Sequence, residues 1–191
     1  LLLRRAELYQ DKIQNREKHK EILRELAARH EPGNQYARQL RKLYHEDENW
    51  GPLAELIESH LAAFADDPRG LAAELLELAT IVREQLRDRD RAAEHLHRAL
   101  SVDPSNGEAL ARYADHFREK RDWRGLADLA EFSVEAGREA GLPVEELVRR
   151  LEELAQVSEL RLGDVERALG AWRRVIELGI PAGGQDPASS K

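Results

Sequence analysis

The chain has 191 residues, of which 35% are charged and 5% are aromatic, and its formal net charge is −7 at pH 7. This composition is typical of long, surface-rich helices rather than of β-sheets. The chain contains no cysteine, which excludes a disulfide framework and a thiolate zinc site. No run approaches the roughly 18 apolar residues that a membrane span requires, so no span is expected.

Ten helical stretches follow one another, separated by residues that start or stop helices. Pro32 and Gly33 end the second stretch, Pro52 suits the first turn of the fourth, and Gly163 separates the last two. The expected helices cover residues 2–14, 16–30, 34–46, 52–66, 68–87, 89–102, 105–120, 122–139, 144–162 and 164–178. Residues 179–191 are rich in Pro, Gly and Ser, which predicts a flexible tail or linker.

One apolar pattern occurs three times, at spacings of about 73 and then about 76 residues. The aligned sets are Leu2, Ala6, Tyr9, Ile13 and Leu23; then Leu75, Ala79, Val82, Leu86 and Leu96; then Leu151, Ala155, Ser158, Leu162 and Trp172. Units that recur in this way cannot each close a core, so they stack on their neighbours and leave a long surface free. We therefore expect an all-α fold: an α-solenoid of about five antiparallel helical hairpins, forming one domain over residues 1–178.

Two of the expected helices carry the apolar stripe of an amphipathic helix. The stripes are Ala92, Leu96, Ala99 and Leu100, and then Ala168, Trp172, Val175 and Ile176. Trp50 and Trp123 share a register, each just ahead of the second helix of a hairpin. Stacking on a ligand is open to these two rings, but their recurrence favours packing between successive layers.

At these positions the chain resembles the tetratricopeptide repeat family. Residues 74–104 match one unit, with small residues at Ala79, Ala92 and Ala99, Leu96 between them and Pro104 at the end, near the family spacing of about 34 residues. The match departs in the first helix, where residues 75–79 read Leu-Leu-Glu-Leu-Ala instead of Trp-x-x-Leu-Gly. The resemblance covers residues 1–178. It implies a right-handed superhelix whose first helices line an inner groove that holds a peptide or a partner helix.

The repeat register places a set of residues along that implied groove. The set is Gln35, Arg38, Lys42 and His45; Leu76, Thr80 and Arg83; Ala111, Asp115 and Arg118; and Arg149, Glu152 and Gln156. Some members of the family grip a C-terminal carboxylate with Lys and Asn at fixed groove positions. This chain has no asparagine there, so that clamp is not expected, although Arg38 and Lys42 remain suited to an acidic partner.

Positive charge gathers near the start of the chain. Residues 4–43 carry about 11 Lys and Arg against about 6 acidic residues, roughly +5 within a chain of −7. This basic end favours an acidic protein partner, with an attraction that weakens as salt rises. The alternation of signs at residues 16–25 is also typical of a solvated helix face. Nucleic-acid binding is not expected, since the chain lacks both an overall basic charge and an array of base-reading aromatics.

The sequence predicts neither an enzyme nor a bound cofactor or metal. No serine lies in a Gly-x-Ser-x-Gly turn. His95 and His97 are two residues apart on a helix and cannot chelate one ion together, and His19 and His45, which lie among charged residues, are expected to be exposed. No strand precedes Gly183-Gly184, so the pair does not form a phosphate-binding loop.

The sequence therefore favours a non-catalytic scaffold or adaptor whose groove binds another protein. Two alternatives stay open. One is a structural or self-associating array that joins through its ends or its Trp172 face. The other is a regulatory sensor domain of a larger multidomain protein. Because the chain starts without Met inside an expected helix, we expect a fragment of a longer, bacterial-type protein. The lack of cysteine fits the cytoplasm or the periplasm, and the cytoplasm is favoured.

Overall fold

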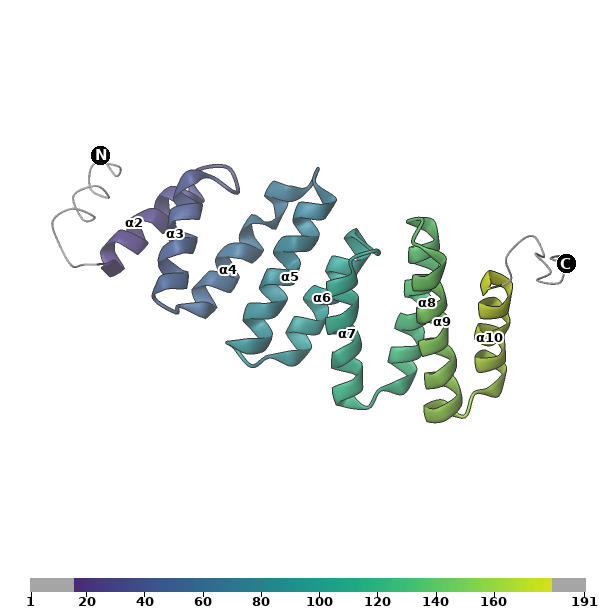
Figure 1. Cartoon of the computed structure of the whole chain (residues 1–191). Coiled ribbons are helices and arrows are strands. Elements are labelled where there is room, and N and C mark those ends of the chain that lie inside the picture. Colours follow the sequence, from purple (N-terminus) through teal and green to yellow (C-terminus); the bar gives the residue numbers. More distant parts are fainter. Residues whose placement is uncertain (1–15, 180–191) are drawn as a thin grey trace, which may run out of the picture. The chain divides into compact units, whose positions relative to one another are not determined.

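The computed structural model describes residues 16–179, and every regular element between them is a helix (Figure 1). The α-helices are α2 (Arg16–Ala28), α3 (Gln35–Glu46), α4 (Trp50–His60), α5 (Pro68–Glu84), α6 (Arg89–Val102), α7 (Gly107–Lys120), α8 (Trp123–Glu139), α9 (Val144–Val157) and α10 (Val165–Gly179). The expected all-α helical-repeat fold is confirmed. The first expected helix, at residues 2–14, and the tail from residue 180 lie outside the described residues.

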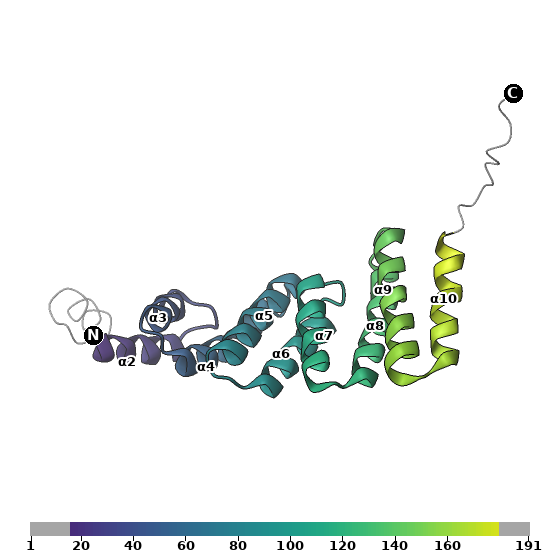
Figure 2. The same ribbon diagram turned by 60° about the horizontal axis from the view of Figure 1, so that its bottom comes forward.

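The chain divides into two compact units, Leu1–Asp103 and Pro104–Lys191. The first unit contains α2 to α6 and the second contains α7 to α10. Within each unit every helix contacts the next one along the chain, as Figures 1 and 2 show. A single repeat domain over residues 1–178 stays a prediction.

Side-chain caps explain where most of the helices begin. Asn34 accepts hydrogen bonds from the backbone N–H groups of Tyr36 and Ala37, at 3.0 and 3.1 Å. Asn106 accepts one from the N–H of Ala109 at 3.0 Å, and Asp67, Asp88, Asp122 and Asp164 cap the helices that follow them in the same way. Each cap pairs a backbone donor that the first turn of a helix leaves without a partner. The cap at Asn106 is the reason that α7 begins at Gly107, slightly later than expected.

Two of the α-helices continue into a short turn of another helical type. After α4 the chain continues as a 3-10 turn at Leu61–Phe64. After α9 it widens into a π-helical turn at Ser158–Leu162, which ends at Gly163 with φ +67°. Glycine suits this left-handed conformation because it has no Cβ to clash.

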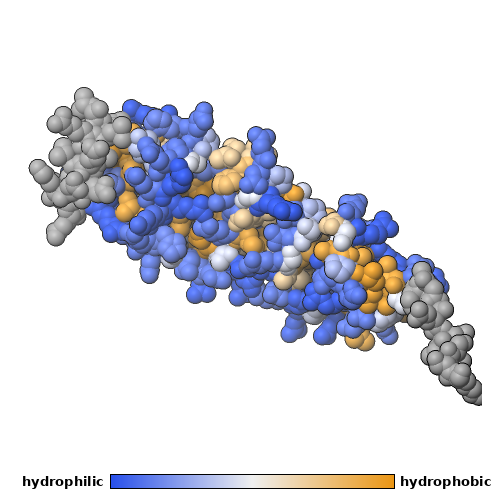
Figure 3. Space-filling view, turned by 45° about the horizontal axis from the view of Figure 1, so that its top comes forward, coloured by the Kyte–Doolittle hydropathy of each residue, from blue (hydrophilic) through white to orange (hydrophobic). Residues whose placement is uncertain are grey.

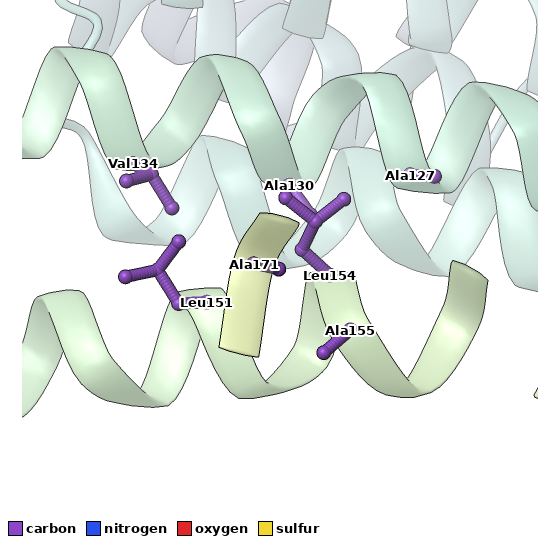
Figure 4. Close-up of a cluster of buried hydrophobic side chains, with 7 residues drawn as sticks. All are labelled: Ala127, Ala130, Val134, Leu151, Leu154, Ala155 and Ala171. Carbon is purple, nitrogen blue, oxygen red and sulfur yellow. The ribbon is translucent and has the colours of Figure 1, made fainter. Parts of the chain in front are cut away.

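Small and large apolar residues alternate in the core of the second unit (Figure 4). Val134 of α8 and Leu151 of α9 point toward each other, and Leu154 lies beside Ala130. Ala127, Ala155 and Ala171 complete the cluster and let the helices approach closely.

The expected apolar stripe of α6 is confirmed, since Ala92, Leu96, Ala99 and Leu100 are all buried. The stripe expected for α10 is buried only in part. Ala168 is buried, but Trp172 and Val175 are half-buried and Ile176 is 60% exposed. The expectation was wrong at Ile176, because no described residue packs over that side of the helix.

Candidate functional site

A groove of about 550 Å³ lies within the second unit. Helices α7 and α9 form its walls and α8 forms its floor. The lining residues are Gly107, Leu110, Ala111, Ala114 and Arg118 of α7; Leu126, Leu129, Ala130 and Ser133 of α8; and Glu146, Arg149, Arg150, Glu152, Glu153 and Gln156 of α9. Three successive helices thus provide a concave site without any contribution from the other unit.

The floor of this groove is apolar. Leu126, Leu129 and Ala130 of α8 meet Leu110 and Ala114 of α7, and all five are at most 9% exposed. On the wall above them Gly107 and Ala111 are exposed and carry almost no side chain, which leaves the groove open on that side. A floor of this kind accepts aliphatic or aromatic side chains of a ligand.

An ion-pair bridge joins the two walls. Arg118 of α7 contacts Glu153 of α9 and also pairs with Asp115 at 2.8 Å. Burial lowers the pKa of Arg118, but its hydrogen bond to Asp115 and the charge of Glu153 outweigh that effect, so the net shift is upward. The bridge links α7 to α9 across the groove, and the raised pKa leaves Arg118 charged.

A second polar cluster fixes the wall that α9 provides. Arg150 donates to the backbone carbonyl of Ser133 at 2.7 Å and to Glu146 at 3.1 Å. Arg149 pairs with the same carboxylate at 2.8 Å. The hydrogen bond from Arg149 is the largest reason that the pKa of Glu146 is lowered. Glu146 therefore stays ionised and holds both guanidinium groups in place.

Two further polar residues of α9 have no such partner. Glu152 and Gln156 line the groove, and neither side chain forms a hydrogen bond or ion pair with any residue that the structure describes. One carboxylate and one amide are thus available to a ligand. Together with Arg118 and Arg149, they give the groove rim both signs of charge.

The structure places the expected groove residues of the second unit largely together. Ala111, Arg118, Arg149, Glu152 and Gln156 line the one groove, whereas Asp115 turns to Arg118 and does not line it. Sequence reasoning missed the floor residues on α8, and on the walls it missed Gly107, Leu110 and Ala114 of α7 and Glu146, Arg150 and Glu153 of α9. Leu126, Leu129 and Ala130 are buried residues of α8 that also face the groove, and an apolar residue in a sequence carries no sign of that second position.

The expected residues of the first unit lie on two neighbouring helices. Gln35, Arg38, Lys42 and His45 are exposed on α3, and Leu76, Thr80 and Arg83 are half-buried on α5. Arg41 of α3 joins the helices through ion pairs with Glu74, at 2.9 Å, and Glu77 of α5. This bridge corresponds to the Arg118–Glu153 bridge of the second unit.

Among the histidines, the expectation for His45 is confirmed and that for His19 is wrong. His19 is only 9% exposed because it lies next to Lys20 on the buried face of α2, which packs on α3. Lys20 itself pairs with Asp47 at 3.0 Å. The ring of Trp50 meets the ring of His45, and Trp123 lies under the guanidinium of Arg161.

The part of the chain between residues 16 and 179 contains no group of three or more His, Asp or Glu residues placed to hold a metal ion. Two serines have structural positions, since Ser133 donates to the carbonyl of Ala130 at 2.8 Å and Ser158 is fully buried. None of the helices described is both long and apolar enough to cross a membrane.

Comparison with known proteins finds similarity in solved structures. No family model matches the chain, and no curated protein matches it. The N-terminal domain of stress-induced protein-1 from C. elegans is 20% identical over 63% of this chain and 90% of that chain, with a TM-score of 0.48. BtubC from P. vanneervenii is 19% identical over 100% of this chain and 84% of that chain, with a TM-score of 0.46. MamA from Desulfovibrio magneticus is 12% identical over 93% and 92%, with a TM-score of 0.42.

At these identities the likenesses concern the fold alone. The fold itself rests on the helices: successive pairs begin at Gln35, Pro68, Gly107 and Val144, at spacings of 33, 39 and 37 residues, and a tetratricopeptide repeat has about 34. In fold, the chain is an array of helical hairpins similar to tetratricopeptide repeats.

Proposed function

We propose that the protein is a non-catalytic interaction scaffold and that the groove between α7 and α9 binds a peptide or a partner helix. The observation that carries this proposal is the groove itself, which combines an apolar floor with polar walls in a volume of about 550 Å³. Binding sites of this size are typically concave and apolar, with a few convergent polar groups that fix the orientation of the ligand.

The lining indicates the chemistry of the ligand. One or two aliphatic or aromatic side chains enter the floor between Leu110 and Leu129. A Lys or Arg of the ligand faces Glu152, and the amide of Gln156 hydrogen-bonds to the ligand backbone. The fixed walls support the proposal because a preformed site loses less conformational entropy on binding.

The exposed cations of α3 are proposed as a second contact, with an acidic stretch of a partner. Among the residues that the structure describes, Lys42 has only a long ion pair of 3.8 Å with Glu46, and Arg38, which is exposed, has none. Both side chains can therefore turn to a carboxylate at little cost.

The groove is tested by filling it. Ala111 is exposed on the groove wall, so Ala111→Trp blocks the groove without disturbing the core. Arg124→Trp is the matched control, because it puts the same ring at an exposed position of α8 outside the lining. Random peptides displayed on phage are selected on the wild-type protein. We expect selected peptides to lose at least tenfold in affinity for Ala111→Trp and to keep their affinity for Arg124→Trp.

Failure to select any peptide, or selection of peptides that bind both variants equally, would reject the groove as the site. Circular dichroism melting of both variants checks that each is folded.

The contact at α3 is tested separately, by capture from cell extract with the double variant Arg38→Glu and Lys42→Glu. Arg69→Glu with Arg124→Glu is the control, because it changes the net charge by the same amount at exposed positions outside both sets. A protein captured by the wild type and by the control, but not by the double variant, supports an acidic partner. Equal capture by all three proteins counts against it.

The regulatory alternative keeps the same groove. In a sensor domain, a peptide bound in the groove would change the activity of an attached effector. The peptides selected by phage display therefore also serve to test the sensor hypothesis.

A further inference from the structure

Helix α10 has an outer face of large apolar residues that no described residue covers. Val165 is 62% exposed, Leu169 49% and Ile176 60%. Their spacing of i, i+4 and i+11 places them on one side of the helix. In Figure 3 apolar surface is visible at the end of the second unit where α10 is found. Exposed aliphatic residues that gather in this way mark an interaction surface.

Comparison of α10 with α8 shows that this face is built to be covered. Asp122 and Asp164 cap their helices identically, each accepting from the backbone N–H three residues later. In that register Leu169 corresponds to Ala127 and Ile176 to Val134. Those two residues of α8 are 0% and 2% exposed, because the α9–α10 hairpin packs over them. The same face of α10 carries larger apolar residues and has no described neighbour.

The charges beside this face favour a second copy of α10 as the partner that packs against it. Glu166 and Arg173 are both exposed, and neither forms an ion pair with any described residue. Their neighbours Arg167 and Arg174, by contrast, are paired with acidic residues of α8. One free anion near the start of the helix and one free cation near its end match the same helix running in the opposite direction.

We propose that two copies of the chain associate through α10, with the helices antiparallel about a two-fold axis next to Leu169. Leu169 packs on Leu169 of the second copy, and Ile176 reaches the end of the other helix that carries Val165. Glu166 of each copy faces Arg173 of the other, twice by symmetry. A parallel arrangement would form neither of these pairs, because it places Glu166 of one copy level with Glu166 of the other. An interface of one helix per copy is at the small end of the range, so dissociation in the micromolar range, about 1–100 µM, is expected.

A charge exchange tests this arrangement more directly than loss of an apolar residue. Glu166→Arg and Arg173→Glu each place like charges across the interface, and each is expected to weaken the dimer about tenfold. The double variant Glu166→Arg with Arg173→Glu restores opposite pairing and is expected to return to wild-type affinity. Sedimentation velocity over a wide range of protein concentrations gives the dissociation constants. Restoration by the double variant is a result that a mere change in fold stability would not produce.

Leu169→Glu provides the second arm. It buries a charge in the interface and is expected to leave a monomer, whereas Val144→Glu, at a similarly exposed position of α9, leaves the dimer intact. A wild-type protein that is monomeric at every concentration overturns the proposal. A dimer whose dissociation constant is unchanged by Leu169→Glu overturns it as well. If the chain shortened to residue 179 dimerises and the full chain does not, residues 180–191 cover the face instead, and the proposal is wrong.

Discussion

At the scale of single residues, His95 is the clearest case in which burial and charge oppose each other. It is 3% exposed on α6, and neither of its ring nitrogens has a hydrogen-bond partner among the described residues. Burial is the main reason that its pKa is lowered below the usual 6.5. The nearby charges of Glu58 and Glu94 act in the opposite direction, and those of Arg91 and Arg98 add to the lowering. His95 is therefore neutral in the folded protein.

This burial makes folding depend on pH. Below pH 6.5 the unfolded chain binds a proton at His95 while the folded protein does not, so the free energy of unfolding falls as the pH drops from 6.5 toward the lowered pKa. Above pH 6.5 both states are neutral and this contribution is constant. We expect His95→Leu to flatten the decrease, since it removes the titrating group and two unpaired polar atoms. Urea unfolding of both proteins between pH 5 and 8 measures how the free energy of unfolding depends on pH.

The exposed His30 provides the control for this experiment. His30→Gln should keep the wild-type dependence on pH, and an unchanged slope in His95→Leu would show that other groups cause the acid sensitivity.

The burial of His95 could not be predicted from its neighbours in the sequence. His95 and His97 lie in the same charged helix, yet only His95 faces the core. Similarly, the charges around His19 suggested exposure, but Lys20 next to it is 2% exposed and pairs with Asp47. The sequence shows which residues are charged. It does not show which of them find a partner of opposite sign inside.

At the scale of helices, the start positions depend on caps, and two asparagines allow a matched comparison. Asn106 accepts a hydrogen bond at the start of α7, whereas Asn49 precedes α4 without any side-chain cap bond. We expect Asn106→Ala to lower the free energy of unfolding of the second unit by about 0.5–2 kcal/mol. Asn49→Ala should cost much less, because no cap bond is lost. Thermal melts of the two variants measure the difference, and equal losses would contradict the role of the cap.

Helix bounds were the most predictable feature because caps, prolines and glycines are local signals. Part of the groove walls also followed from the sequence, because residues that share a register share a face, as Ala111, Arg118 and Arg149 do. The floor did not. Leu129 of α8 is buried and also faces the groove, and the periodicity of apolar residues cannot distinguish a core position from a position on a groove floor. For α10 the sequence offered self-association through the Trp172 face only as one alternative, because an apolar stripe shows that Ile176 suits a contact but not whether a neighbour is present.

At the scale of the whole molecule, two units with separate cores predict that damage stays local. Leu96 is 2% exposed in the first unit and Leu154 is 2% exposed in the second. Replacing either with Ala leaves a cavity that costs about 2–5 kcal/mol. In a repeat array this loss falls mainly on the hairpins in contact with the cavity.

Hydrogen exchange followed by mass spectrometry distinguishes local from global effects. Leu96→Ala should speed exchange in α5 and α6 and leave α9 and α10 protected, and Leu154→Ala should do the reverse. Leu160→Ala, at a 73% exposed position, is the control, and it should leave the exchange rates of both pairs of helices unchanged. If Leu96→Ala speeds exchange equally in α5 and in α10, the chain unfolds as one cooperative block. The free energy of each hairpin would then depend on the entire chain rather than on its neighbours, which is the opposite of what separate cores imply.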